Sequence, residues 1–229
     1  MIKKEFNIKE ISLKYFVGIN QIKFNLRQFL QLFKIYNEAE ALKYLFKLIQ
    51  ELQNNNKGSL IQFIKDKYLL NENHLLTACY YMQKAFYYNN NISNKKNIEF
   101  LLYLSTNRQI SKGIETFGID INDLRKGNLL FCIVSEFNNI DKINSEILRL
   151  LKVNEIELSI NSLSNEKLTA IKEYYDISDN QFFTILNSYG IKYIDEKISN
   201  IDLNSISLAL YDLICEKMAL LNLEKIKIR

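Results

Sequence analysis

Hydrophobic positions recur at steps of three and four residues in several parts of the chain, which is the spacing of amphipathic helices. One helical region is predicted from about Leu26 to Gln53, and the polar segment 54–58 ends it. A long helix is predicted from Glu72 to Tyr88. Further helices are predicted over Ile110–Phe117, Asp141–Leu151, Glu166–Tyr175, Asn180–Tyr189 and Leu203–Leu223.

The ends and faces of these helices carry their own signals. Gly118 follows a predicted helix at the position where a left-handed residue commonly ends one. Ser178 and Gln181 have the spacing of a capping box. In the last helix, one face is predicted to be apolar and to pack on the core; it consists of Ile206, Leu210, Ile214, Met218 and Leu221.

Other apolar runs are short enough to be strands. Residues 11–24 predict two short strands around Gly18, residues 60–69 are strand-like, and Leu129–Val134 is the clearest buried strand. For Ile98–Leu104, the pattern does not separate helix from strand. Strands interspersed with helices predict a mixed α/β (α+β) fold, with a small central sheet flanked by helices in one domain of residues 1–229.

Composition is that of an ordinary soluble globular protein. The chain has 229 residues, of which 48% are hydrophobic and 24% charged. With 30 basic and 26 acidic residues the net charge is only +4, so we expect any contact with nucleic acid to be local and modest. No apolar run is long enough for a membrane span, and polar residues interrupt the basic start before a signal peptide could form. We expect a cytoplasmic protein without membrane contact.

The chemically reactive residues do not form a recognisable catalytic or metal site. Cys79, Cys132 and Cys215 lie far apart in apolar runs, and His74 is the single histidine. This spacing fits buried, reduced thiols and neither a metal centre nor a disulfide framework. The six glycines are isolated, so no phosphate-binding loop is present. We therefore predict a binding or scaffold protein with no cofactor, and not an enzyme.

Several short motifs between residues 60 and 151 follow one another in a distinctive order. They are Asn73–Ala78, Gln83–Phe86, Glu99–Ser105, Asn107–Ser111 and Phe117–Ile119. Their order and spacing resemble the kinase-binding subunit of the KEOPS complex, the TPRKB family. Near the C-terminus, Glu216–Leu221 resembles the closing helix of that family. Family members are usually shorter, so the helical region 37–58 looks like an insertion, and residues 152–200 match poorly.

The resemblance implies a mixed α/β domain without an active site of its own. Members of the family dock on the small kinase-like ATPase subunit of KEOPS, whose other face holds the threonylcarbamoyl transferase. The complex puts a threonylcarbamoyl group on tRNA, which yields threonylcarbamoyladenosine. The resemblance therefore implies two partners, the kinase-like subunit and tRNA.

A candidate tRNA-binding site follows from the same resemblance. Lineages that retain an Arg-Gln-Ile motif are associated with holding the single-stranded 3′ CCA tail, and Arg108-Gln109-Ile110 is intact here. An arginine, an amide and an apolar platform suit unpaired nucleotides. We add Asn107, Lys112 and His74 to the rim of this site. The alternative is structural: Arg108 as a surface cation, Gln109 as a helix-start residue, Ile110 as a core anchor and His74 as a satisfied buried histidine.

For the kinase-like partner, we predict the closing helix as the binding surface. The residues assigned to it are Leu213, Met218, Leu220 and Leu223. The alternative is that the apolar residues of this helix face the core of the protein itself. Two other functions stay open: a purely structural protein–protein adaptor with no RNA contact, favoured by the small net charge, and an unrecognised small-molecule enzyme.

Overall fold

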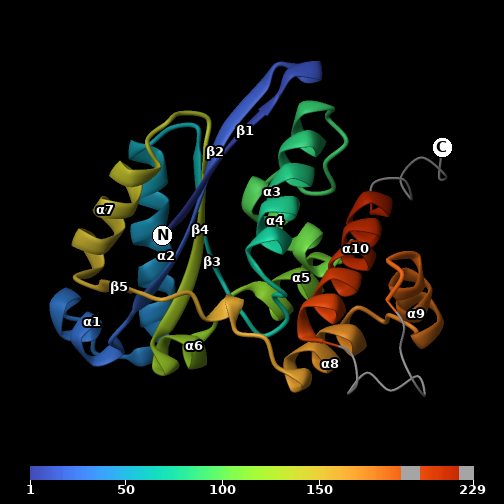
Figure 1. Cartoon of the computed structure of the whole chain (residues 1–229). Coiled ribbons are helices and arrows are strands. Elements are labelled where there is room, and N and C mark those ends of the chain that lie inside the picture. Colours follow the sequence, from blue (N-terminus) through green and yellow to red (C-terminus); the bar gives the residue numbers. More distant parts are fainter. Residues whose placement is uncertain (192–201, 222–229) are drawn as a thin grey trace. The chain divides into compact units, whose positions relative to one another are not determined.

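The computed structural model describes residues 1–191 and 202–221 (Figure 1). The chain forms two compact units, each made from two separate segments. One, which we call the sheet unit, comprises Met1–Lys65 and Gly118–Ser159. The other, the helical unit, comprises Asp66–Phe117 and the described residues from Ile160 onward. The predicted mixed α/β class is confirmed: the strands of the described residues all lie in the sheet unit, and both units contain helices.

The sheet unit is built on a five-stranded sheet in which every pairing is antiparallel. The strand order is β1-β2-β4-β3, and β5 also pairs with β2. This arrangement makes β2 and β4 the central strands. The strands are β1 (Ile2–Ile8), β2 (Leu13–Lys23), β3 (Ser59–Ile64), β4 (Asn128–Ser135) and β5 (Asn154–Ile156).

Strand β2 is one continuous element, so the prediction of two short strands around Gly18 was wrong. Gly18 pairs with Lys3 of β1 on one side and with Ile133 of β4 on the other. A Cβ atom at Gly18 would lie 2.4 Å from Cγ2 of Ile140. The glycine therefore allows close packing in mid-strand and makes no turn.

Two buried amides explain why β2 lacks a clean alternation of apolar and polar residues. Asn20 and Gln21 are both buried. The Asn20 Nδ2 atom donates to Oδ1 of Asn144 at 2.8 Å, and the Gln21 side chain exchanges two hydrogen bonds with Ser159. Because buried amides need partners, these bonds hold the strand at one register and one orientation.

Helices α2 and α7 lie side by side on one face of this sheet (Figure 1). The helical region predicted from about Leu26 to Gln53 is helical and consists of two helices, because Lys34 takes a left-handed φ of 53° and the side chain of Asn37 caps a new helix. The helices of the sheet unit are α1 (Leu26–Phe33), α2 (Glu38–Asn55), α6 (Ile121–Lys126), α7 (Ile140–Leu151) and the 3-10 turn η1 (Lys9–Ile11).

In the described residues, the helical unit consists of helices alone, and the ambiguous run Ile98–Leu104 is one of them. The capping box of Ser178 and Gln181 is confirmed. Gly118 does not take a left-handed conformation; it forms an isolated bridge with Ile64 within the sheet unit. The helices are α3 (Glu72–Tyr87), α4 (Lys96–Ser105), α5 (Ile110–Phe117), α8 (Asn165–Tyr174), α9 (Asp179–Ser188) and α10 (Leu203–Leu220), and the 3-10 turn η2 (Ser159–Asn161) precedes α8.

No helix in the described ranges has both the length and the hydrophobicity that crossing a bilayer requires. The predicted insertion at residues 37–58 corresponds to α2, whose Leu45, Leu48 and Ile49 are buried in the core of the sheet unit. Whether α2 is extra relative to the family stays a prediction.

The close approach at Gly18 generates a stability prediction. Gly18→Ala should lower the free energy of unfolding by about 1–3 kcal/mol, because the new methyl group overlaps Cγ2 of Ile140. Chemical denaturation measures this change. In the double variant with Ile140→Ala the overlap is removed. The double variant should therefore lose less stability than the sum of the losses in the two single variants. Additive effects would show that Ile140 does not limit the space at Gly18.

Candidate functional site

The predicted motif Arg108-Gln109-Ile110 lies where α4 ends and α5 begins. Thr106 takes a left-handed φ of 48° and ends α4. The Oδ1 atom of Asn107 accepts a hydrogen bond from the backbone N–H of Gln109 at 2.9 Å. Asn107 therefore shapes the turn into α5, a structural role that leaves its carboxamide oxygen already engaged.

Arg108 holds the end of the last helix in place. Its Nη1 atom donates to the carbonyl oxygen of Leu221 at 2.9 Å, and Leu221 is the C-cap residue of α10. A cation at this position satisfies a carbonyl that the helix leaves unpaired and faces the negative end of its dipole. Arg108 is half-buried, so it is an anchored residue and not a freely moving surface cation.

The residues that follow Arg108 are presented to solvent. Gln109 and Lys112 are exposed, and Ile110 keeps 45% of its surface exposed. Ile110 is therefore not the buried core anchor of the alternative interpretation. Ile114, one turn further along α5, is also 45% exposed. The two isoleucines form one apolar stripe, and only Ile110 was recognised from the sequence, although their spacing of four residues was the available signal.

The opposite side of α5 explains why this stripe faces outward. Gly113 is buried, and a Cβ atom there would lie 3.2 Å from Cδ2 of Leu102 and 3.4 Å from the carbonyl oxygen of Leu101. Helix α5 therefore packs closely on α4 at Gly113. That contact fixes the rotation of the short helix and leaves Ile110 and Ile114 on its solvent side.

His74 does not belong to this surface, and its assignment to the rim of the site is corrected. The side chain is fully buried. The backbone N–H of Leu70 donates to Nδ1 of His74 at 3.3 Å, and the hydroxyl of Tyr175 lies 3.3 Å from Nε2. That hydroxyl donates to the carbonyl oxygen of Leu104, so it accepts from the Nε2–H of His74. His74 is a satisfied structural histidine.

Burial also decides the charge of this histidine. Loss of hydration lowers the pKa of His74 from 6.5 to about 4. Protonation would place a second N–H against the backbone N–H of Leu70, where an acceptor is needed. His74 is therefore neutral at physiological pH, with its proton on Nε2.

The predicted partner-binding residues on α10 divide into buried and exposed ones. Leu213 and Met218 are only 4% and 0% exposed, so the structure contradicts their assignment to an outer surface. Met218 lies on the face of α10 that was predicted to pack on the core, whereas the burial of Leu213 was not predicted. Leu220 is 47% exposed and stays available for a partner. Leu223 lies outside the described residues.

The three cysteines of the chain are free thiols. Cys79 and Cys132 are buried, Cys215 is partly exposed, and none of the three forms a disulfide. Burial raises the pKa of the Cys215 thiol, which keeps it protonated. Within residues 1–191 and 202–221, no three His, Cys, Asp or Glu side chains come together in a group that could hold a metal ion.

A comparison with known protein families gives the class of protein to which the chain belongs. A family model with the description "kinase binding protein CGI-121" matches residues 33–222. The chain belongs to this family of kinase-binding proteins, which is the TPRKB family that the sequence motifs resemble. The matched range includes the Arg108-Gln109-Ile110 turn and all of α10. No curated protein matches the chain.

The buried histidine predicts how stability depends on pH. Between pH 6.5 and about 4 the unfolded chain binds a proton at His74 and the folded chain does not, so the free energy of unfolding falls as the pH falls. From pH 7 to pH 5 this contribution should be on the order of 2 kcal/mol. Denaturant titrations at both pH values measure it.

His74→Gln provides the control, because it removes the single histidine of the chain. The variant is expected to be less stable at pH 7 and to lose less additional stability than the wild type on going to pH 5. An equal loss in both proteins would contradict a depressed pKa at this position.

Proposed function

We propose that this protein is a non-catalytic accessory subunit of the KEOPS complex in the cytoplasm. In this proposal it binds the kinase-like ATPase subunit, and through it the threonylcarbamoyl transferase. It also helps to recruit tRNA by its 3′ CCA tail for threonylcarbamoyladenosine modification. Membership of the kinase-binding family supports the first partner. The arrangement of Arg108, Gln109 and Ile110 supports the second.

The observation that carries the tRNA proposal is that the residues of this motif differ in their contacts. Arg108 is bound to the end of α10, while Gln109 and Ile110 extend beyond it into solvent. The amide of Gln109 can pair with the edge of an unstacked base, and the exposed surface of Ile110 and Ile114 gives a base an apolar support. The ammonium group of Lys112 provides the nearby charge for a phosphate.

The structure changes which residue tests this site best. Arg108→Glu would also remove the hydrogen bond to Leu221, so a loss of RNA binding could reflect a displaced helix. Substitutions of the solvent-facing residues avoid this problem. Ile110→Glu puts a negative charge where a phosphate or a base should lie, at a side chain that is 45% exposed.

The first functional prediction compares tRNA with and without its CCA end. Wild-type protein should bind intact tRNA roughly tenfold more tightly than trimmed tRNA, since single bases contribute about 1–3 kcal/mol when they stack. Ile110→Glu and Gln109→Ala should bind both tRNAs with the affinity that the wild type shows for trimmed tRNA. Fluorescence anisotropy with labelled tRNA measures these affinities.

Leu208→Glu is the matched control, because Leu208 is 48% exposed on α10, against 45% for Ile110. It should leave the preference for intact tRNA unchanged. Equal binding of intact and trimmed tRNA by the wild type would exclude the tail-binding role. Because the tail offers few phosphates, the salt dependence should be shallow, with a slope of about −0.7 for each neutralised phosphate.

The C-terminal end of α10 is the part of the predicted kinase-binding surface that is exposed. Leu220 presents an apolar side chain there, whereas Leu213 and Met218 are buried. The hydrogen bond from Arg108 to Leu221 fixes this end of the helix. A rigid apolar residue suits docking, because little conformational freedom is lost on binding.

Leu220→Glu should therefore weaken binding of the kinase-like KEOPS subunit at least tenfold, by placing an unpaired charge in an apolar contact. Leu208→Glu alters an equally exposed leucine at the other end of the same helix and should retain wild-type affinity. Calorimetric titration with the purified kinase-like subunit gives both values. Wild-type affinity for Leu220→Glu would show that the kinase-like subunit docks elsewhere.

A purely structural adaptor is the second candidate function. The small net charge and the use of Arg108 as a helix anchor both favour it. This adaptor would bind the kinase-like subunit with full affinity and show no preference between intact and trimmed tRNA. The two experiments above therefore separate the candidates.

A further inference from the structure

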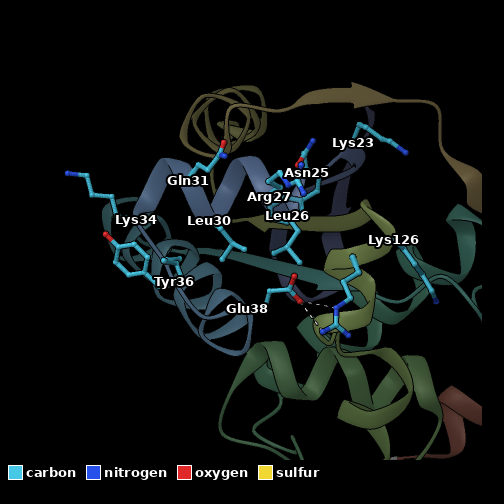
Figure 2. A pocket seen from close by; sticks show the side chains of 13 residues that line it. Lys23, Asn25, Leu26, Arg27, Leu30, Gln31, Lys34, Tyr36, Glu38 and Lys126 are labelled. Atoms are coloured by element: carbon cyan, nitrogen blue, oxygen red, sulfur yellow. Dashed lines mark hydrogen bonds and ion pairs between the residues drawn. The ribbon is translucent and has the colours of Figure 1, made fainter.

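A basic groove opens in the sheet unit where β2 leads into α1 and α6 ends. Its volume is about 930 Å³. Figure 2 shows the side chains that line it. Five of them are cations and one is a carboxylate, which is a strong excess of positive charge for a chain with a net charge of only +4. The cations are Lys23, Arg27, Lys34, Arg125 and Lys126.

The single carboxylate of the groove is already engaged. Oε2 of Glu38 accepts hydrogen bonds from Nε and Nη2 of Arg125, at 3.1 and 3.0 Å (Figure 2). The remaining Nη1 of Arg125 donates to Asn122. Glu38 therefore neutralises Arg125. Among the described residues, the lining of the groove contains no second carboxylate that could pair with the other four cations.

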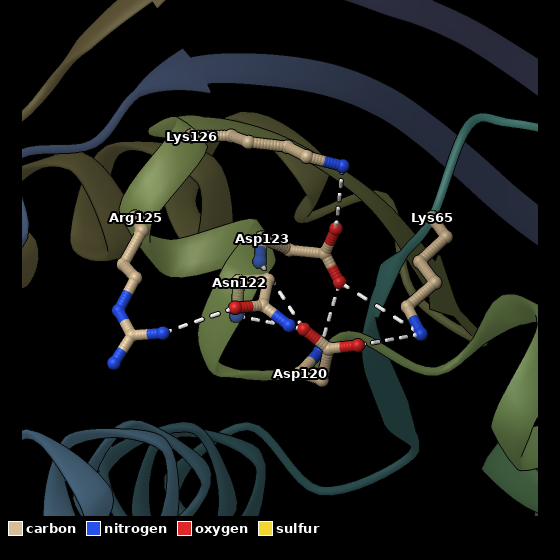
Figure 3. Close-up of polar contacts among 6 residues, drawn as sticks. All are labelled: Lys65, Asp120, Asn122, Asp123, Arg125 and Lys126. Atoms are coloured by element: carbon tan, nitrogen blue, oxygen red, sulfur yellow. Dashed lines mark hydrogen bonds and ion pairs between the residues drawn. The ribbon is translucent and has the colours of Figure 1, made fainter.

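The acidic residues next to the groove are committed as well, as Figure 3 shows. Asp120 lies 2.9 Å from Nζ of Lys65, and this contact holds the pKa of Asp120 below its usual value. Asp123 accepts from the backbone N–H of Asp120 in a capping box and lies 4.0 Å from Lys65. Lys126 reaches Asp123 only at 3.9 Å, so this lysine is weakly compensated.

Two cations of the groove serve no packing or pairing role in the fold. Helix α1 buries Leu26 and Phe29 and turns Arg27 to solvent. In the part of the chain that the structure describes, the side chains of Arg27 and Lys34 make no hydrogen bond or ion pair. Like charges around one hollow repel each other, and an anionic ligand would relieve that repulsion.

A fully exposed aromatic ring stands at the same groove. Tyr36 lies in the connection between α1 and α2 with 96% of its surface exposed, although its neighbours Phe29, Phe33 and Tyr44 pack together in a cluster. Leaving a large aromatic ring in water gains nothing for folding. Next to several cations, it provides a surface on which an unpaired base can stack.

We infer that the basic groove binds single-stranded RNA, with Arg27, Lys34 and Lys126 on the phosphates and Tyr36 stacked on a base. The charged groups are exposed along an open groove, which suits an extended polyanion better than a small molecule that must be enclosed. The exposed ring favours RNA over an acidic protein segment, for which charge alone would suffice. This inference does not rest on the proposed function, because the Arg108 motif lies in the helical unit.

The test measures binding of a fluorescein-labelled 12-nucleotide oligouridylate, which has no CCA end, to the full chain. The double variant Arg27→Glu/Lys34→Glu should bind roughly tenfold more weakly, with a salt slope reduced by about 1.4 for two lost phosphate contacts. Tyr36→Ala should weaken binding roughly fivefold or more without a change in slope, since it removes stacking and no charge.

Lys4→Glu/Lys9→Glu is the matched control. It makes the same change in net charge at exposed lysines of β1 and η1, and neither lysine lines the groove. It should alter the affinity by less than about twofold. Circular dichroism and thermal unfolding test whether each variant is folded. Because the substituted side chains are exposed, we expect all variants to be folded.

Three results would overturn the inference. One is an unchanged affinity for oligouridylate in both groove variants. Another is an equal loss in the Lys4/Lys9 control, which would show binding by overall charge. The third is that the groove variants lose binding to a labelled 12-residue oligoglutamate while they still bind oligouridylate as the wild type does. That result would make the groove a site for an acidic protein. Because the probe has no CCA end, none of these results depends on tail binding at Arg108.

Discussion

Pairing of β2 with β4 is the interaction on which the sheet unit depends. These strands occupy the centre of the sheet, and their register joins residues more than a hundred positions apart, as Phe16 with Ser135. The buried amides of Asn20 and Gln21 allow one register, because a slip by one residue would leave them without partners. Strand β2 leads directly into α1, so the same register also positions Lys23 and Arg27 at the basic groove.

Periodicity predicted the long helices and the buried strand β4 well, because each carries a repeated apolar face that tertiary packing reinforces. It failed where a single residue serves a distant partner. Gly18 looked like a turn in the sequence, and only the position of Ile140 explains a glycine in mid-strand. Lys34 and Asn37 divide the predicted helical region into two helices, and a lysine in a left-handed conformation gives no sequence signal for that boundary.

The candidate sites divide along the same line. The position of the Arg108-Gln109-Ile110 motif at a helix start was predictable, since local turn chemistry determines it. That Arg108 holds Leu221 was not, because the partner lies 113 residues away. The burial of Leu213 was equally hidden, since a single residue on a helix does not reveal what packs against it. The basic groove was missed because its cations come from separate segments and net charge averages over them.

The interleaving of the two units has a consequence for how the protein is made. Each unit is made of two segments that are separated in the sequence by a segment of the other unit. No single cut of the chain therefore releases either unit intact. During synthesis, β1, β2 and β3 emerge first, yet β2 and β3 meet only through β4. The sheet edges must therefore wait, unpaired, while residues 66–117 are translated. A ribosome-bound chain that ends before β4 should accordingly be prone to aggregation and a substrate for chaperones.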